Sequence, residues 1–297
     1  MKRLAIIIVT YNSEKDIYDC IASIQKHADI PLSEIELIVV DNNSNETDTM
    51  FNKIKQQYGE DITLIKNSSN GGYGQGNNVG IRKATAPIVL IMNPDVRLME
   101  PIFKTALKAF EKKPELCIYG MKQMLSADIP STNSFACTYM MNGYLYTFLT
   151  SFGNRFDCYI PKYMHFSGSC FYIRKSMFED IGLFDESVFM YGEEDDIHFR
   201  LRKKGFSQMK YNPHLHYIHL TKERKPNLTY EIKLAEIAIQ QNEKKGYPAH
   251  KTIKNRIRNA KIMLIREYVK IKFGKKDTAL YDMLKEYIST LKNRKTK

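Results

Sequence analysis

Long apolar runs and closely spaced cysteines are both absent from this sequence of 297 residues. No apolar stretch approaches the roughly 18 residues that a helix needs to cross a bilayer, which argues against a transmembrane protein. The cysteines are odd in number and show no C-x-x-C spacing, which indicates a reducing compartment and argues against a zinc site. They are Cys20, Cys117, Cys137, Cys158 and Cys170.

Net charge is also scarce over most of the chain. Residues 251–297 contain 15 Lys and Arg against four Asp and Glu, so they carry +11 of the total charge of +12. The rest is close to neutral, and attraction to an acidic partner is expected of the C-terminal segment alone. Hydrophobic residues make up 43% of the chain, which is typical of a globular protein with a sizeable core.

Short apolar runs alternate with helical patterns in the first third of the chain. The run 4–9 is followed by polar residues without a small-residue cleavage site, so we expect a buried strand there and not a signal peptide. Further strands are expected at 36–40, 62–66 and 88–92, and a helix at 47–58. This alternation predicts βαβ units in an α/β fold, with a mostly parallel sheet flanked by helices.

The strand 88–92 ends abruptly at Asn93-Pro94-Asp95. Pro94 has no amide to give to a sheet, so it forces the chain out of the strand pairing. Open α/β sheets bind ligands outside the carboxyl ends of their strands, and an Asp there suits a divalent cation that bridges two phosphates. An ordinary turn after the strand is the alternative.

Five glycines stand within ten residues between Asn70 and Gly80. Glycine costs conformational entropy on folding, so we expect these positions to allow a close approach of the backbone, with a phosphate or sugar at the start of a helix over 77–84. The stretch fits neither the P-loop nor the dinucleotide-binding pattern. A flexible surface loop is the alternative.

Four consecutive acids, Glu193 to Asp196, begin another predicted helix. They cannot all face one way, so one or two are expected to point into a site, where one is a candidate general base. The alternative is an acid-rich helix start, which the helix dipole favours. Gly168 stands at the start of a preceding strand and allows a close approach there.

The segment 211–219 contains three histidines, of which His214 and His216 share a face if the chain is extended, and His219 lies on the other. One imidazole can join a cation site, although a packed or surface histidine is the more common case. Residues 121–165 show no sustained period. They form either an excursion toward an acceptor or an irregular part of the core.

We expect an α/β domain over 1–225 and a helical, basic extension over 226–297. In the extension, apolar residues recur every three or four positions between Lys and Arg, which predicts basic amphipathic helices. The apolar face is expected either to contact an anionic membrane surface through 251–297 or to pack on the main domain or a second subunit.

Seven motifs, in order over about residues 4–220, give this chain a resemblance to the family 2 glycosyltransferases of the GT-A fold. It is most similar to the rhamnosyltransferase-like branch that builds bacterial surface polysaccharides. The motifs are Val9-Thr-Tyr-Asn12, Val40-Asp-Asn-Asn-Ser44, Asn70-x-Gly-Tyr-x-x-Gly-Asn-Asn-x-Gly80, Met92-Asn-Pro-Asp95, Ser167-Gly168, Gly182-x-Phe-Asp-Glu186 and Tyr191-x-Glu-Glu-x-Asp-Ile-x-x-Arg200.

The resemblance implies an inverting transfer of a sugar from a nucleoside diphosphate to a hydroxyl group, with Mn²⁺ or Mg²⁺ as cofactor. It implies that Asp95 and His219 hold the metal and that Glu194 is the general base, with Glu193 as the alternative. The implied donor-binding residues are Thr10, Tyr11, Asn12, Asp41, Asn70, Gly72, Asn78, Asn93 and Asp95. The implied acceptor-side residues are Ser167, Gly168, Asp196 and Arg200.

Rhamnose is the favoured sugar, and a donor linked to dTDP or UDP fits. Galactose, galactofuranose or another hexose is the alternative. A glycan or lipid-linked glycan is the expected acceptor, which implies a peripheral protein on the cytoplasmic face of the membrane.

Three other functions are less consistent with the sequence. A nucleotidyltransferase would carry Arg or Lys in its phosphate loop, and Asn70–Gly80 has none. No nucleic-acid-binding module is found, so no nucleic acid partner is expected. A non-catalytic scaffold that binds nucleotide sugars would have no need of Asp95 and the acids at 193–196.

Overall fold

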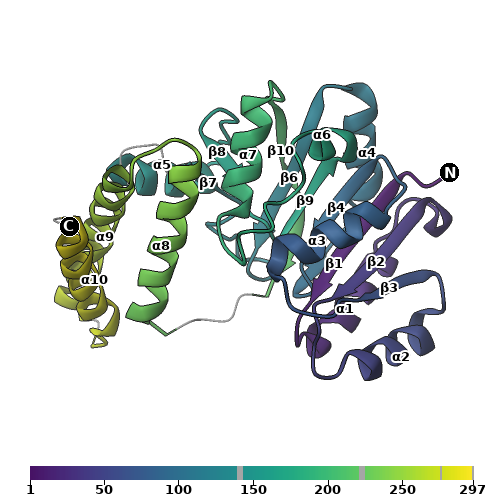
Figure 1. The fold of residues 1–297 in the computed structure, drawn as a ribbon, viewed down its shortest axis with the longest axis horizontal. Coiled ribbons are helices and arrows are strands. Elements are labelled where there is room, and N and C mark those ends of the chain that lie inside the picture. The colour runs from purple at the N-terminus through teal and green to yellow at the C-terminus, as the bar shows by residue number, and fades with distance from the viewer. Residues whose placement is uncertain (139–142, 221–224, 275, 296–297) are drawn as a thin grey trace. The chain divides into compact units, whose positions relative to one another are not determined.

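The computed structural model describes residues 1–138, 143–220, 225–274 and 276–295 (Figure 1). The chain divides into two compact units. Unit 1 consists of residues 1–135 and 159–221, and unit 2 of residues 136–158 and 222–297. The predicted domains divide the chain at residue 225, whereas in the structure residues 136–158 belong to the same unit as the C-terminal helices.

Among the described residues, eight strands form one sheet in unit 1, in the order β3-β2-β1-β4-β9-β6-β10-β5. β2, β1 and β4 pair in parallel, as do β2 with β3 and β6 with β10, whereas β9 and β5 run the other way. The strands are β1 (Leu4–Thr10), β2 (Ile35–Asp41), β3 (Ile62–Lys66), β4 (Ile88–Met92), β5 (Val96–Leu98), β6 (Leu116–Met124), β9 (Cys170–Arg174) and β10 (Gln208–His219).

Helices cover both faces of this sheet because alternate strand residues point to opposite faces. On one face, Ile6 and Ile8 of β1 belong to a core cluster with residues of α1, α2 and α4. On the other, α3 crosses in front of β1 in Figure 1. The elements of this unit outside the large sheet are α1 (Glu14–Lys26), η1 (Leu32–Glu34), α2 (Thr47–Tyr58), α3 (Gly72–Lys83), α4 (Phe103–Lys112), β8 (Met164–Phe166), α6 (Lys175–Asp180) and α7 (Glu193–Lys203).

The glycine-rich segment is the main difference from the predicted elements. Helix α3 begins at Gly72 and not near residue 77. A methyl group added at Gly76 would come within 2.7 Å of Val9, and one at Gly80 within 2.6 Å of Ile7. These glycines therefore let α3 lie close against β1, where a larger side chain has no room. The predicted helix start at residue 77 is wrong, and the approach of a phosphate or sugar to the start of this helix stays a prediction.

Unit 2 is helical. Its helices are α5 (Gly143–Arg155), α8 (Leu228–Lys244), α9 (Ala249–Lys272) and α10 (Ala279–Lys295), and the short strand β7 (Phe135–Cys137) leads into it. Apolar residues of α8, α9 and α10, among them Ala235, Ile257 and Leu291, form a core of their own. No helix in the described parts of the chain is long and apolar enough to cross a membrane.

Candidate active site

Asp41, the last residue of β2, is the centre of a buried hydrogen-bond network. Its side chain has no exposed surface, and its two oxygens accept hydrogen bonds from four groups. These are the hydroxyls of Thr10 (2.8 Å), Ser44 (2.6 Å) and Thr47 (2.5 Å) and the amide of Ser44 (2.8 Å). Because each carboxylate oxygen already accepts two hydrogen bonds, Asp41 holds the ends of β1 and β2 together, and Thr10 is equally buried.

Tyr11 and Asn12 lie at the open end of β1. The ring of Tyr11 is 52% exposed, which leaves it accessible to a ligand. Asn12 has a left-handed backbone with φ of 51°, and its amide donates to the Ser44 hydroxyl at 2.8 Å. Its side-chain oxygen accepts from the amide of Asn45 at 3.1 Å, so the loops after β1 and β2 form one rim.

Asn70 and Gly72 are used by the chain itself. The side-chain oxygen of Asn70 accepts from the amide of Gly72 at 3.0 Å, and the carbonyl of Gly72 accepts from Asn42 at 2.8 Å. Gly72 has φ of +89°, and an added methyl group would meet the Phe189 carbonyl at 2.1 Å. The same carbonyl accepts from the amide of Tyr73, so the first turn of α3 binds the segment before α7.

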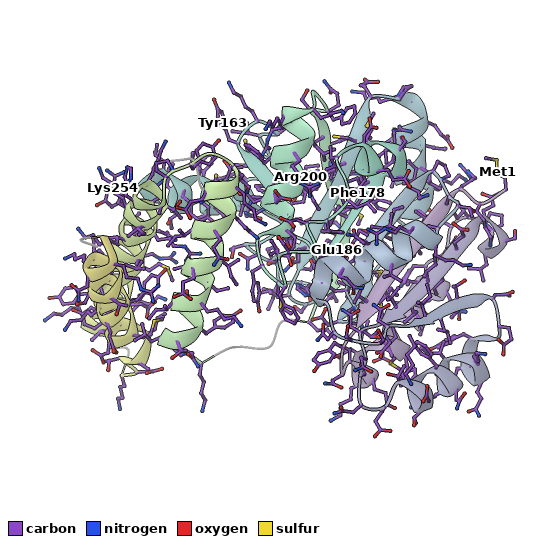
Figure 2. The ribbon with its side chains drawn as sticks, viewed as in Figure 1. Met1, Tyr163, Phe178, Glu186, Arg200 and Lys254 are labelled. Atoms are coloured by element: carbon purple, nitrogen blue, oxygen red, sulfur yellow. The ribbon has the colours of Figure 1, made fainter. Side chains whose placement is uncertain are left out.

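Asn78 is fully buried and holds another loop. Its side-chain amide donates to the carbonyl of Phe184 at 3.0 Å and to Glu186 at 2.9 Å, and its oxygen accepts from the amide of Phe184. Glu186, labelled in Figure 2, also pairs with Arg82 at 2.9 Å. Both ends of the Asn78 amide are therefore engaged within the protein.

Asp95 and His219 lie together, 124 positions apart in the sequence. Oδ1 of Asp95 is 3.3 Å from Nε2 of His219, and the carbonyl of Asp95 accepts from the amide of Leu220 at 2.9 Å. The cause is the pairing of β5 with β10, which sets Val96 opposite His219. The two side chains are 33% and 19% exposed, so both can reach a ligand.

A divalent cation fits this pair of ligands. Carboxylate oxygen and imidazole nitrogen both bind Mn²⁺, and such cations commonly take one or two protein groups and fill the other positions with substrate phosphates and water. Within the described residues, no group of three or more His, Cys, Asp or Glu could hold a metal. A cation here would therefore depend on the phosphates of its substrate.

Glu194, in the first turn of α7, lies directly against Gly168. A methyl group added at Gly168 would come within 2.1 Å of Oε1 of Glu194. Nδ1 of His198 lies 2.7 Å from the Glu194 carbonyl, and Nε2 accepts from the amide of Phe166 at 3.3 Å, so this buried histidine carries its proton on Nδ1 and anchors the turn. The close approach predicted at Gly168 is made to a carboxylate of the protein.

Glu193 differs sharply from its neighbour. It is only 4% exposed, and its Oε1 has no hydrogen-bond partner. Burial, and after it the charge of Glu194, raises the pKa of Glu193 to about 8. Glu193 therefore keeps its proton at neutral pH, while Glu194 is half-buried and lies beside Gly168.

Of the remaining acceptor-side candidates, Asp196 and Arg200 are structural partners of each other. Arg200, labelled in Figure 2, contacts Asp196 at 2.6 Å across one turn of α7, and it also donates to the carbonyl of Ile181. Ser167 donates its amide to the carbonyl of Ser134 at 3.0 Å. Asp196 and Arg200 thus fix α7 to the loop that precedes it.

Ser169 connects the Glu194 region to the Asp95–His219 pair. Its carbonyl accepts from the amide of Asn93 at 2.8 Å, just after β4. Its hydroxyl is 3.0 Å from the hydroxyl of Tyr217, two residues before His219. Since Ser169 follows Gly168, the candidate base Glu194 lies at the same end of the sheet as the candidate metal ligands Asp95 and His219.

Four residues at this end of the sheet hold the loops of the site by hydrogen bonds and were not predicted from the sequence. They are Asn42, Tyr73, Ser169 and His198. Tyr73 donates its hydroxyl to the carbonyl of Gly168 at 2.6 Å, and burial raises its pKa well above the ordinary value. Its place inside the glycine-rich motif was a signal that this large ring fills a defined space. Ser169 and His198 gave no signal, because Asn93 and Tyr217, which contact Ser169, and Phe166, which contacts His198, are distant in sequence.

The fold is that of the GT-A class, as the sequence predicts. The mannosyltransferase PcManGT of Pyrobaculum calidifontis, solved with GDP-Man and Mn²⁺, superposes with a TM-score of 0.64 at 16% identity. The superposition covers 99% of this chain and 87% of that one. The S. aureus TarS fragment 1–349 in complex with UDP gives a TM-score of 0.53 at 19% identity, over 80% of this chain and 65% of that one.

The chain belongs to glycosyl transferase family 2, whose pattern matches residues 5–182. It is 29% identical over 209 residues to the low-salt glycan biosynthesis hexosyltransferase Agl10 of Haloferax volcanii. This match covers 69% of this chain and 63% of that protein. It is 26% identical over 241 residues to the N-acetylglucosaminyl-diphospho-decaprenol L-rhamnosyltransferase of Mycobacterium tuberculosis, over 73% of this chain and 75% of that protein. This chain thus spans less than two thirds of the length of Agl10.

Proposed function

We propose that this protein transfers a hexosyl group, with rhamnosyl favoured, from a nucleoside diphosphate sugar to a hydroxyl group of a glycan or lipid-linked glycan, with inversion at the anomeric carbon. One observation carries the proposal: Glu194 and the Asp95–His219 pair lie at the same end of the sheet, linked through Gly168 and Ser169. Membership of family 2 and the names of the hexosyltransferase and rhamnosyltransferase relatives support it.

Donor binding is proposed for the rim formed after β1 and β2. The exposed ring of Tyr11 offers a stacking surface for a base, and Asn12 offers polar groups beside it. Thr10 and Asp41 support this rim by their buried hydrogen bonds, and Asn70, Gly72 and Asn78 hold the neighbouring loops in place. A dTDP or UDP donor is the favoured choice.

Asp95 and His219 are proposed to hold Mn²⁺ or Mg²⁺ against the diphosphate, with Asn93 at the same strand end. A cation held by Asp95 and His219 would supply positive charge that neutralises the departing nucleoside diphosphate. Two structural neighbours, the mannosyltransferase PcManGT and GalNAc-T7, were solved with Mn²⁺, which supports this proposal.

Glu194 is proposed as the general base. It takes the proton of the acceptor hydroxyl while the oxygen forms a bond to the anomeric carbon and the bond to the diphosphate oxygen breaks on the opposite face. A single displacement of this kind inverts the anomeric centre and needs one carboxylate. Burial and retention of its proton argue against Glu193 in this role.

Galactosyl, galactofuranosyl or other hexosyl transfer is the alternative within the same mechanism, and a non-catalytic scaffold is the alternative outside it. The lipid-linked acceptor favours a position at the cytoplasmic face of a membrane. The basic residues of 251–297 suit an anionic surface, since each contributes about 1 kcal/mol of attraction.

A donor-hydrolysis panel tests the proposal. The protein with Mn²⁺ is offered dTDP-rhamnose, UDP-galactose, UDP-glucose, UDP-N-acetylglucosamine and GDP-mannose, beside the Asp95→Ala variant. Slow release of one nucleoside diphosphate, lost in the variant and with EDTA, is the expected result and identifies the donor. Calorimetry that detects nucleotide binding without turnover, even with candidate acceptors added, would favour the scaffold and refute the transferase.

A further inference from the structure

Helix α5 of unit 2 and the residue that follows it carry an exposed aromatic stripe, formed by Phe148, Phe152 and Phe156. These residues recur every fourth position, so they lie on one side of the helical path. Their side chains are 62%, 45% and 60% exposed, and successive ring centroids are 5.9 Å and 4.6 Å apart. Soluble proteins rarely expose contiguous aromatic surface of this kind without a binding role.

The stripe is a fixed feature because α5 is packed tightly on α9. A methyl group added at Gly143 would come within 2.1 Å of the carbonyl of Asn255, so the two backbones touch there. One turn later, the hydroxyl of Thr147 donates to the side-chain oxygen of Asn259. The face of α5 that contacts α9 is thus occupied by small residues, and the phenylalanines lie outside this contact.

Arginine side chains flank the aromatic residues at both ends of α5. The guanidinium of Arg258 lies 5.7 Å from the ring centroid of Tyr144, one turn before the stripe. That of Arg155 lies 5.8 Å from the ring centroid of Phe156. The sequence of α5 contains no Asp or Glu. Guanidinium groups bind phosphate in a bidentate manner, and aromatic rings favour the interface between water and hydrocarbon.

We propose that α5 seats this protein on an anionic lipid bilayer, with the aromatic stripe in the boundary between headgroups and acyl chains. Charge favours this occupant, because residues 251–297, which include most of α9, carry a net +11. α9 adds exposed apolar residues at Ile265, Val269 and Phe273. With 13 residues α5 is about 20 Å long, which suits a helix lying in the interface plane and not one that spans it.

This inference deepens the proposed function, since a lipid-linked acceptor would be met at such a surface. It differs from attraction by the basic segment alone, which places charges near lipid phosphates but inserts nothing. Removal of 251–297 would not separate the two, because Ile253, Ile257 and Leu291 belong to the core of unit 2. Point substitutions on α5 do separate them.

A single tryptophan gives the most direct test, because the chain contains none. Phe152→Trp is compared with Ile129→Trp, whose position is 55% exposed in unit 1. Vesicles of phosphatidylcholine, with or without phosphatidylglycerol, are added to each. We expect a blue shift and quenching by brominated lipid for Phe152→Trp with anionic vesicles only. No shift, or an equal shift in both variants, would overturn the proposal.

Vesicle sedimentation gives a second test. The double variant Phe148→Ser with Phe152→Ser is compared with Leu125→Ser with Ile129→Ser, which removes exposed apolar residues from unit 1. Because the variant loses the burial of two phenylalanines in the bilayer, it should bind anionic vesicles at least about 10-fold more weakly than the control. Unchanged binding, together with loss of a dimer in light scattering, would assign the stripe to a second copy instead.

The two proposals fail separately. Vesicle binding is measured without any donor, and donor hydrolysis is measured without any membrane. An α5 variant that keeps donor hydrolysis and loses vesicle binding supports the inference with its fold intact. If the protein binds vesicles but hydrolyses no donor, the result supports membrane binding by α5 and contradicts the proposed transferase activity.

Discussion

Oε1 of Glu194 occupies the space beside Gly168 that a β-carbon would fill, because a methyl group there would lie 2.1 Å from it. The residue type at position 168 therefore sets the position of the proposed base. Gly168 belongs to a loop between β8 and β9, and Glu194 to the first turn of α7, so the contact joins two segments that the sheet alone does not align.

Gly168→Ala should reduce sugar transfer while leaving nucleotide binding unchanged. Displacement of a reacting group by about 1 Å costs on the order of 100-fold in rate. The measurement is turnover with the donor found in the panel, beside calorimetry with its nucleoside diphosphate. Gly80→Ala is the comparison, because its methyl group meets Ile7 at 2.6 Å in the core and should cost about 1–3 kcal/mol of stability without a specific effect on rate. Full turnover by Gly168→Ala would contradict the assignment of Glu194.

The Asp95–His219 pair should control metal-dependent nucleotide binding. His219→Ala and Asp95→Asn are each expected to weaken binding of the nucleoside diphosphate with Mn²⁺ by about 10-fold or more, and to bind like the natural protein in EDTA. His216→Ala is the matched control, because His216 lies on the same strand and contacts Glu100 at 2.7 Å. Equal losses for His216→Ala and His219→Ala in titration calorimetry would argue against the metal role.

Glu193 should make stability fall as pH rises. Its pKa in the folded protein is raised to about 8 from an ordinary value of 4.5, so its favourable contribution is complete below about 4.5 and is lost as pH rises through 8. Glu193→Gln removes this loss and should gain on the order of 4 kcal/mol relative to the natural protein between pH 5 and pH 9. Urea unfolding across that range tests it, with exposed Glu60→Gln as control. Parallel pH profiles for all three proteins would contradict the buried, protonated state.

Asp41→Asn should destabilise the rim rather than remove a single ligand contact. The amide group of Asn would face two donors that now reach a carboxylate oxygen, which costs on the order of 2–4 kcal/mol. Asp48→Asn, whose side chain is 80% exposed in the same region, should change stability by less than about 0.5 kcal/mol. Thermal unfolding measures both. An unchanged melting temperature with lost nucleotide affinity would instead make Asp41 a direct ligand.

Local patterns predicted those elements whose ends are marked in the sequence. The bounds of α2, β3 and β4 coincide with the predicted 47–58, 62–66 and 88–92. In β4 an unbroken apolar run is stopped by an Asn-Pro pair, and both signals are local. The alternating units predicted the α/β class with a mostly parallel sheet, whereas the GT-A fold was predicted correctly from the resemblance to the family 2 glycosyltransferases.

Tertiary contacts decided the rest. Helix α3 has poor helix formers, and Gly76 and Gly80 are explained by Val9 and Ile7, which lie more than 60 residues earlier. The same holds for α5, whose partner α9 is remote in sequence. At the site, the sequence indicated Asp95, His219 and Glu194 as candidate functional residues. That the hydrogen-bonding groups of Asp41 and Asn78 are engaged within the protein is seen only in the structure, because their partners come from other segments.

Unit 2 is assembled from two stretches of chain that are synthesised at different times. Thr147 of α5 and its partner Asn259 of α9 are 112 residues apart. A ribosome that adds about 5–20 residues per second needs roughly 6–20 s to reach the second after the first. The last two strands of the large sheet, β9 and β10, are made in that interval. The nascent chain thus carries an aromatic helix for seconds before the helix that anchors it exists, and this interval is when a holding chaperone has most to protect.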